Sequence, residues 1–141
     1  MARQSKVPVF IIHHYTSLPN PFRPLRETAA KIYRDHRIPA AQATQVILCS
    51  DYVIRKLNRR YRGIDKPTDV LSFTYGEEDL LGEIYISLQR CAAQARKIGH
   101  SYQREVLRML VHGMFHLLGY EHDTERKRAQ MQRQESRYCL P

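Results

Sequence analysis

SYQREVLRMLVHGMFHLLG, residues Ser101 to Gly119, is the longest helical pattern in the chain and the stretch that decides the fold. Its apolar residues recur at helical spacing but spread around much of the helix circumference: Val106, Leu107, Leu110, Val111, Met114, Phe115, Leu117 and Leu118. A helix that is apolar on most sides is surrounded by the rest of its domain. The sequence therefore predicts a largely buried central helix that begins near Ser101 and ends at Gly119.

The segments before and after this helix alternate between strand-like and helix-like patterns. Strands are expected at Pro8 to His14, Thr44 to Ser50, Asp69 to Phe73 and Glu83 to Ser87. Further helices are expected at Leu25 to Arg37, from an Asp51 N-cap to about Arg60, from a Ser87 N-cap to about Ile98, and after an Asp123 N-cap. We predict an α+β fold in a single domain spanning residues 1–141, with a central mixed sheet of about four strands covered by about five helices.

Composition favours a soluble, globular protein. Of the 141 residues, 43% are hydrophobic and 26% are charged. No apolar run approaches the roughly 18 residues typical of a membrane span, and no secretory signal is apparent. The cysteines Cys49, Cys91 and Cys139 are odd in number and form no CxxC pair. We therefore expect no disulfide framework, and we expect a cytoplasmic location.

The charge is strongly basic and unevenly distributed. Lys and Arg number 23 against 14 Asp and Glu, which gives a net charge of +9. Six of the basic residues lie in RKLNRRYRGIDK, Arg55 to Lys66, and five more lie between Glu125 and Arg137. Such an excess favours a polyanionic partner such as nucleic acid, although a merely solvated basic surface is the alternative.

HGMFHLLGYEH, residues His112 to His122, has the spacing of a metal site at the end of the long helix. His112 and His116 share one helical face, and a turn at Gly119 would bring His122 to the same point. Zinc binds histidine nitrogens at about 2.0–2.1 Å, and three protein ligands leave a fourth position open for catalysis. We therefore predict one Zn²⁺ per chain, although three imidazoles also suit nickel, copper or iron.

The residue between the first two histidines argues against a peptidase. In the HExxH motif of zinc proteases a glutamate follows the first histidine and acts as general base, whereas this chain has Gly113. Three neutral ligands leave the zinc charge undiminished, which acidifies a bound water and attracts a phosphate oxygen. Glu121 and Asp123 flank His122, and we interpret them as orienting that ring or capping a helix rather than as the base.

Several segments together resemble the YbeY family of bacterial endoribonucleases, also called rRNA maturation factors. They are LNRRYRGIDKPTDVLSF (Leu57 to Phe73), LGEIYIS (Leu81 to Ser87), HGMFHLLGYEH, and an M-x-x-x-E pattern at Met131 and Glu135. The resemblance implies metal-dependent cleavage of single-stranded RNA. It further implies 3′-end maturation of 16S rRNA, the RNA of the small ribosomal subunit, and ribosome quality control, with the ribosome or its assembly factors as partners.

The resemblance also assigns residues. His112, His116 and His122 match the metal ligands, and Arg62 matches the arginine implicated in activity. Glu83 and Glu121 stand where the family usually has aspartate, which leaves the role of Glu83 open.

The neighbouring basic residues are interpreted as a diffuse surface for the RNA backbone: Arg55, Lys56, Arg59, Arg60 and Lys66. Tyr61 and Tyr120 are suited to stacking on bases, but packing is the favoured interpretation for both. Two alternatives stay open, a zinc metallopeptidase-like hydrolase and a non-enzymatic ribosome-assembly factor with a structural zinc. The nucleophile, either water or the RNA 2′-OH, and the oligomeric state are not predicted.

Overall fold

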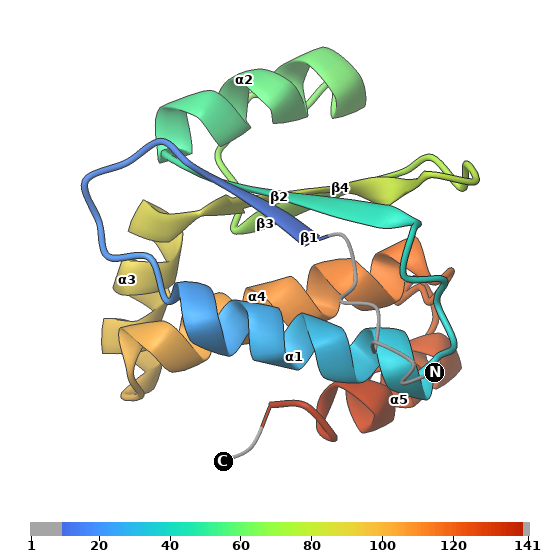
Figure 1. Cartoon of the computed structure of the whole chain (residues 1–141). Coiled ribbons are helices and arrows are strands. Elements are labelled where there is room, and N and C mark those ends of the chain that lie inside the picture. The colour runs from blue at the N-terminus through green and yellow to red at the C-terminus, as the bar shows by residue number, and fades with distance from the viewer. Residues whose placement is uncertain (1–9, 140–141) are drawn as a thin grey trace.

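The computed structural model of the chain describes residues 10–139, in which four strands and five helices alternate (Figure 1). In chain order they are β1 (Phe10–His14), α1 (Phe22–Asp35), β2 (Ala43–Cys49), α2 (Asp51–Arg62), β3 (Val70–Thr74), β4 (Leu80–Ser87), α3 (Leu88–Ile98), α4 (Tyr102–Leu117) and α5 (Glu125–Glu135). The predicted α+β fold with a mixed sheet is confirmed. Every helix among residues 10–139 is too short or too polar to cross a membrane.

The sheet has the strand order β1-β2-β4-β3. The pairs β1–β2 and β2–β4 are parallel, whereas β3 pairs antiparallel with β4 and forms one edge. Helix α2 lies alone on one face of the sheet, and the other four described helices lie on the opposite side (Figure 1). Side chains of a strand alternate between these two faces, so β2, β3 and β4 each contribute both to the main core and to a smaller apolar cluster under α2.

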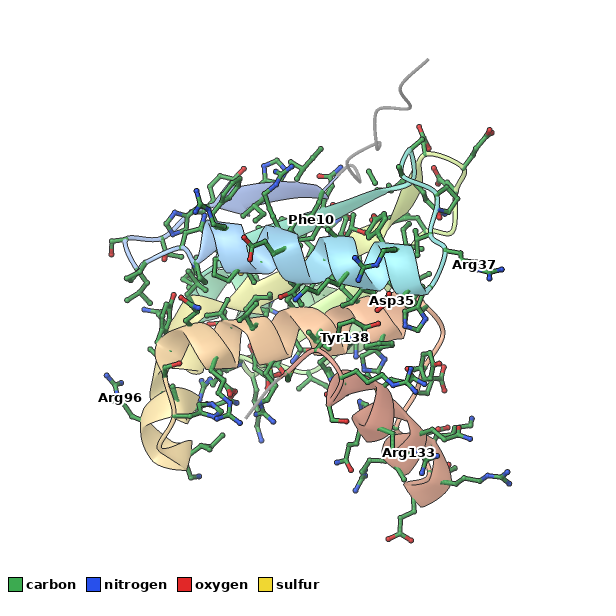
Figure 2. The ribbon with its side chains drawn as sticks, turned by 60° about the horizontal axis from the view of Figure 1, so that its bottom comes forward. Phe10, Asp35, Arg37, Arg96, Arg133 and Tyr138 are labelled. Carbon is green, nitrogen blue, oxygen red and sulfur yellow. The ribbon has the colours of Figure 1, made fainter. Side chains whose placement is uncertain are left out.

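Helix α4 forms the centre of the main core, as its apolar pattern predicts. Val106, Leu110, Val111, Met114 and Phe115 are all fully buried. Helices α1 and α5 pack along α4, and the hydroxyl of Tyr138, which follows α5, donates to Asp35 of α1 at 2.7 Å (Figure 2). The contact ties the end of the described chain to the first helix.

Two glycines allow α4 to approach the sheet closely. A Cβ atom on Gly113 of α4 would lie 2.7 Å from Cγ2 of Ile84, and one on Gly82 of β4 would lie 2.5 Å from both Leu117 and the Phe73 carbonyl oxygen. The hydroxyl of Ser72 in β3 also donates to the Gly113 carbonyl at 3.4 Å. A side chain at either glycine would force the helix away from β3 and β4.

Most predicted elements are confirmed, with small corrections at their ends. Ser87 caps α3 as predicted, but Ser50, not Asp51, caps α2, and Thr124, not Asp123, caps α5. In both corrected cases a hydroxyl one residue away accepts the backbone N–H at the third helical position. Residues 8 and 9 of the predicted first strand lie outside the described part of the chain.

The first helix differs from its predicted range at both ends. It begins at Phe22, before the predicted Leu25, because the proline at position 24 falls in the first turn, where its missing N–H needs no partner. It ends at Asp35 because Arg37 adopts a left-handed backbone with φ of 53°, and Ile38 donates to the Tyr33 carbonyl.

We predict that Gly113→Ala destabilises the protein although alanine is the better helix former. Alanine favours a helix by about 1 kcal/mol, but overpacking against Ile84 costs about 1–3 kcal/mol. Gly113→Glu should destabilise far more, because it buries a charge against the sheet. Urea unfolding measures both, with exposed Lys97→Ala as a control that stays within about 0.5 kcal/mol of the wild type. A Gly113→Ala variant more stable than the wild type would contradict this packing.

Candidate metal centre

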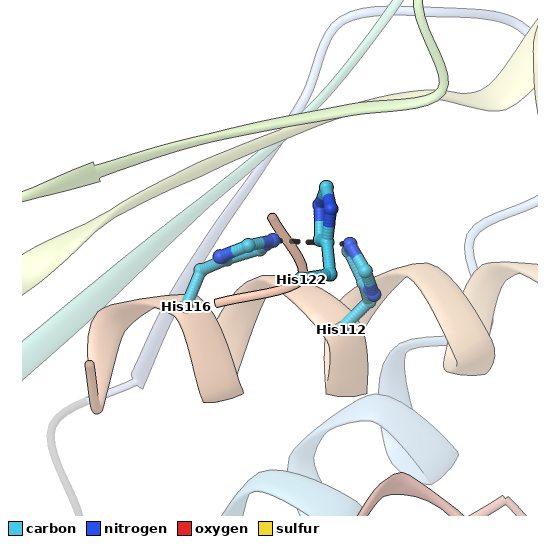
Figure 3. A group of neighbouring side chains, drawn as sticks. All are labelled: His112, His116 and His122. Carbon is cyan, nitrogen blue, oxygen red and sulfur yellow. Dashed lines mark hydrogen bonds between the residues drawn. The ribbon is translucent and has the colours of Figure 1, made fainter. Parts of the chain in front are cut away.

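The three predicted histidines converge at the C-terminal end of α4 (Figure 3). The Nε2 atoms of His112 and His116 lie 3.1 Å apart, and one ring nitrogen from each of the three residues lies within 4.8 Å of the others. Two nitrogens bound to one tetrahedral zinc are separated by roughly 3.3 Å, so the pair on α4 is already at ligand spacing. The group can therefore hold a metal ion.

Local backbone geometry explains the convergence. His112 and His116 are four residues apart on α4 and project from consecutive turns. Helix α4 ends at Leu117. Two residues later Gly119 has φ of 93°, and the backbone N–H of Tyr120 donates to the Phe115 carbonyl at 3.0 Å. This left-handed glycine reverses the chain, and the loop that follows places His122 beside the two helical rings.

Glu135 of α5 sets the orientation of His112. Its carboxylate accepts a hydrogen bond from His112 Nδ1 at 3.0 Å. A proton on Nδ1 leaves the lone pair of Nε2 free to face the other ligands, as in the carboxylate–histidine–metal arrangement of many metalloproteins. The sequence places Glu135 in the M-x-x-x-E pattern but indicates no role for it, because spacing along the chain does not reveal that α5 returns to α4.

The surroundings of His116 favour its neutral ring, which is the form that binds metal. Burial, assisted by the neighbouring His112 and His122, lowers the pKa of His116 to about 4. The positive charge of Arg62 lowers the pKa of His116 by a smaller amount, so this guanidinium acts electrostatically on the His116 ring. At neutral pH His116 therefore offers a lone pair, and the residues present fit a divalent cation.

The histidines open into a cavity of about 640 Å³ between α4, β3 and α2, which we call the histidine cavity. Its lining includes the three histidines, Asn58 and Arg62 from α2, and Ser72 and Thr74 from the edge strand β3. The structure thus brings all four predicted site residues to one cavity. Arg62 reaches it because it ends α2 at the β3 edge of the sheet.

The acidic residues near the site occupy different surroundings. Glu121 and Asp123 line the histidine cavity but are exposed at its rim, and Asp123 lies 3.5 Å from Lys127. Asp69 also lines it, but its oxygens accept hydrogen bonds from the Val70 backbone and Gln94. None of the three is buried beside the histidines as a dedicated base would be.

Glu83 lies away from the histidine cavity. It belongs to the face of β4 that is turned toward α2, because Ile84 and Ile86 belong to the main core and side chains alternate. Its carboxylate accepts a hydrogen bond from the Tyr75 hydroxyl at 2.5 Å. The contact points to a role in strand and surface structure.

The remaining candidates divide between packing and exposure. Met131 is buried in the main core, and Tyr120 packs edge-on against Phe115 with ring centroids 5.3 Å apart. Tyr61 contacts Phe73 but is 58% exposed, so packing does not account for most of its ring.

We predict that Glu135→Ala weakens zinc binding by about 10–100-fold, because His112 loses the acceptor that fixes its ring. Glu135→Gln should lose less, since the amide oxygen can still accept from Nδ1. Competition with a chelating dye measures both affinities. Glu125→Ala, which removes the same charge from an exposed position of α5, is the matched control. Equal zinc affinity in Glu135→Ala and wild type would rule out this orienting role.

Comparison with known proteins agrees with the resemblance seen in the sequence. The family model described as endoribonuclease YbeY matches residues 19–140. A relative named endoribonuclease YbeY from Desulfitobacterium hafniense is 48% identical over 100 residues, covering 62% of this chain and 64% of the relative. Another relative of that name, from Persephonella marina, is 40% identical over 113 residues, covering 76% and 73%. The chain therefore spans just under two thirds of the first relative and somewhat more of the second.

A solved structure supports the same grouping. The solution structure of the protein TM1509 from Thermotoga maritima is similar to this chain with a TM-score of 0.66 and 30% sequence identity. The similarity covers 93% of this chain and 87% of that protein. With the family model matched over most of its length, the chain belongs to the endoribonuclease YbeY family.

Proposed function

We propose that this protein is a metal-dependent endoribonuclease that cleaves single-stranded RNA. His112, His116 and His122 hold the metal, and Arg62 contacts the scissile phosphate. The observation that carries the proposal is that one cavity contains both a cluster of three imidazoles that could hold a metal ion and an arginine side chain. Cations that surround a phosphodiester stabilise the charge that develops on its oxygens during cleavage.

The residues divide the chemistry between them. When bound, zinc supplies Lewis acidity and lowers the pKa of a coordinated water. The guanidinium of Arg62 offers two parallel donors to phosphate oxygens, and Glu135 keeps the His112 ring in its binding orientation. Either water or the RNA 2′-OH can serve as the nucleophile.

Position 113 supports RNA rather than peptide as the substrate. The residue that acts as base in HExxH proteases corresponds to Gly113, which packs against Ile84 and Ser72 of the sheet and does not itself line the histidine cavity. A glutamate there would have to displace the sheet before it reached the metal. The net charge of +9 and the basic residues of α2 add attraction for a polyanion.

We further propose finer assignments on the strength of family membership. The metal is Zn²⁺, the RNA is that of the small ribosomal subunit, and cleavage serves maturation of the 16S rRNA 3′ end and ribosome quality control. The ribosome or its assembly factors are the expected partners, and the cytoplasm is the expected location. A single domain spanning residues 1–141 remains a prediction of the sequence.

We predict that His116→Ala and Arg62→Ala both abolish most cleavage of single-stranded RNA, for different reasons. His116→Ala should lose bound zinc, whereas Arg62→Ala should keep it and lose about 100–1,000-fold in kcat, the typical effect of removing one charge-stabilising donor. Metal content and single-turnover cleavage of a labelled RNA measure the two effects. Arg96→Ala, at an exposed position of α3, is the control for charge.

Two outcomes would contradict the assignment. Equal cleavage by wild type and His116→Ala would indicate a contaminating nuclease. Turnover of peptides with RNA left intact would favour the metallopeptidase alternative.

We predict that removing the metal abolishes cleavage without unfolding the protein. The core around α4 is extensive and does not include the exposed His122. A chelator should therefore stop RNA cleavage while the far-ultraviolet circular dichroism stays native, and added zinc should restore activity. Loss of secondary structure on chelation would instead favour a non-enzymatic assembly factor with a structural zinc.

A further inference from the structure

Helix α2 presents polar side chains to two separate cavities. Asn58 and Arg62, four residues apart, line the histidine cavity. Another face of the same helix lines a second cavity of about 570 Å³. We call this second cavity the α2 groove, and its lining consists of Tyr52, Arg55, Lys56, Arg59, Arg60 and Asp65.

Most cations of the α2 groove have no carboxylate partner within the described chain. Arg55 is engaged, since it donates to Asp65 at 2.9 Å and 3.3 Å. Lys56, Arg59 and Arg60 form no ion pair with any carboxylate among residues 10–139. Like charges on one helix surface repel each other, and an anionic ligand would relieve that repulsion.

Exposed aromatic rings stand beside these cations. The ammonium of Lys56 lies 4.6 Å from the ring centre of Tyr52, and the guanidinium of Arg60 lies 5.4 Å from that of Tyr61. The two tyrosines are 67% and 58% exposed, respectively. Exposed rings interleaved with cations are the chemistry that binds single-stranded nucleic acid, because bases stack on the rings while phosphates meet the charges.

We propose that the α2 groove binds the part of a single-stranded RNA that lies outside the histidine cavity. Lys56 and Arg60, in one row of the helix with Tyr52, contact the phosphates, and Tyr52 and Tyr61 stack on bases. Arg62 lines the histidine cavity, and Arg59, about one helical turn before it, lines the α2 groove, so a strand that leaves the histidine cavity past Arg62 reaches the groove. The proposal rests on the proposed function, because it extends the path of the same RNA.

The test compares how tightly short and longer single-stranded RNA bind to the wild type and to the double variant Lys56→Ala/Arg60→Ala. The longer RNA should bind the wild type more tightly than the short one. Near 0.15 M salt, the variant should bind the longer RNA roughly tenfold more weakly than the wild type does. The slope of its log affinity against log salt concentration should be shallower by about 1.4, because two lost phosphate contacts account for about 0.7 each.

A matched control removes the same residue types from the other side of the molecule. Arg96→Ala/Lys97→Ala takes one arginine and one lysine from exposed positions of α3, where Arg96 points away from the body of the protein (Figure 2). This control should keep the full gain in affinity for the longer RNA over the short one. The charge-conserving variant Lys56→Arg/Arg60→Lys should also keep most of it. Urea unfolding checks that all variants fold like the wild type.

The outcomes separate this inference from the proposed function. A wild type that cleaves RNA, with a Lys56→Ala/Arg60→Ala variant that keeps the full gain, overturns the groove and leaves the nuclease intact. An equal loss in the Arg96→Ala/Lys97→Ala control also overturns the groove, because general charge would then explain the binding. A wild type that binds longer RNA through the groove but cleaves none overturns the proposed function instead.

Discussion

The close approach of α4 to the edge of the sheet is the constraint on which the site depends. Gly113 on the helix and Gly82 on β4 leave no room for a Cβ atom, because the side chains of Ile84 and Leu117 pack directly onto the backbone of these two glycines. This contact fixes the height of His112 and His116 above β3, and β3 in turn supports the end of α2 that carries Arg62. A looser contact would separate the imidazoles from the guanidinium that shares their cavity.

Much of this arrangement was predictable from the sequence, because short-range periodicity governs it. The apolar residues around Leu110 predicted a buried helix, and the spacing of His112, His116 and His122 with a glycine turn predicted their convergence. The fold class followed from alternating strand and helix patterns. The cap positions were wrong by one residue because Ser50 and Asp51, or Asp123 and Thr124, are all good caps, and only the backbone geometry decides between them.

Local sequence patterns could not predict contacts between segments that are far apart in the chain. The sequence does not show that Glu135 returns to His112 across 23 positions, or that Glu83 turns toward α2 rather than toward the histidines. Nor does it show which way position 113 faces. The sequence suggested that Gly113 was a missing base, whereas the structure gives it a positive role in packing α4 against Ile84.

The two faces of α2 follow from helical geometry and connect recognition to the site. Residues 58 and 62 share one face, and residues 52, 56 and 60 share another, because each set is spaced by four. A rigid helix keeps the two faces in constant register, so in the proposed RNA path a phosphate bound at Arg62 would determine how far along the strand the next contacts fall. Flexible loops would not impose that spacing. In the sequence, the basic run from Arg55 to Lys66 suggests one diffuse charged surface. The fold divides it: Arg62 lies beside the histidines, and a separate row of cations lies beside exposed tyrosines.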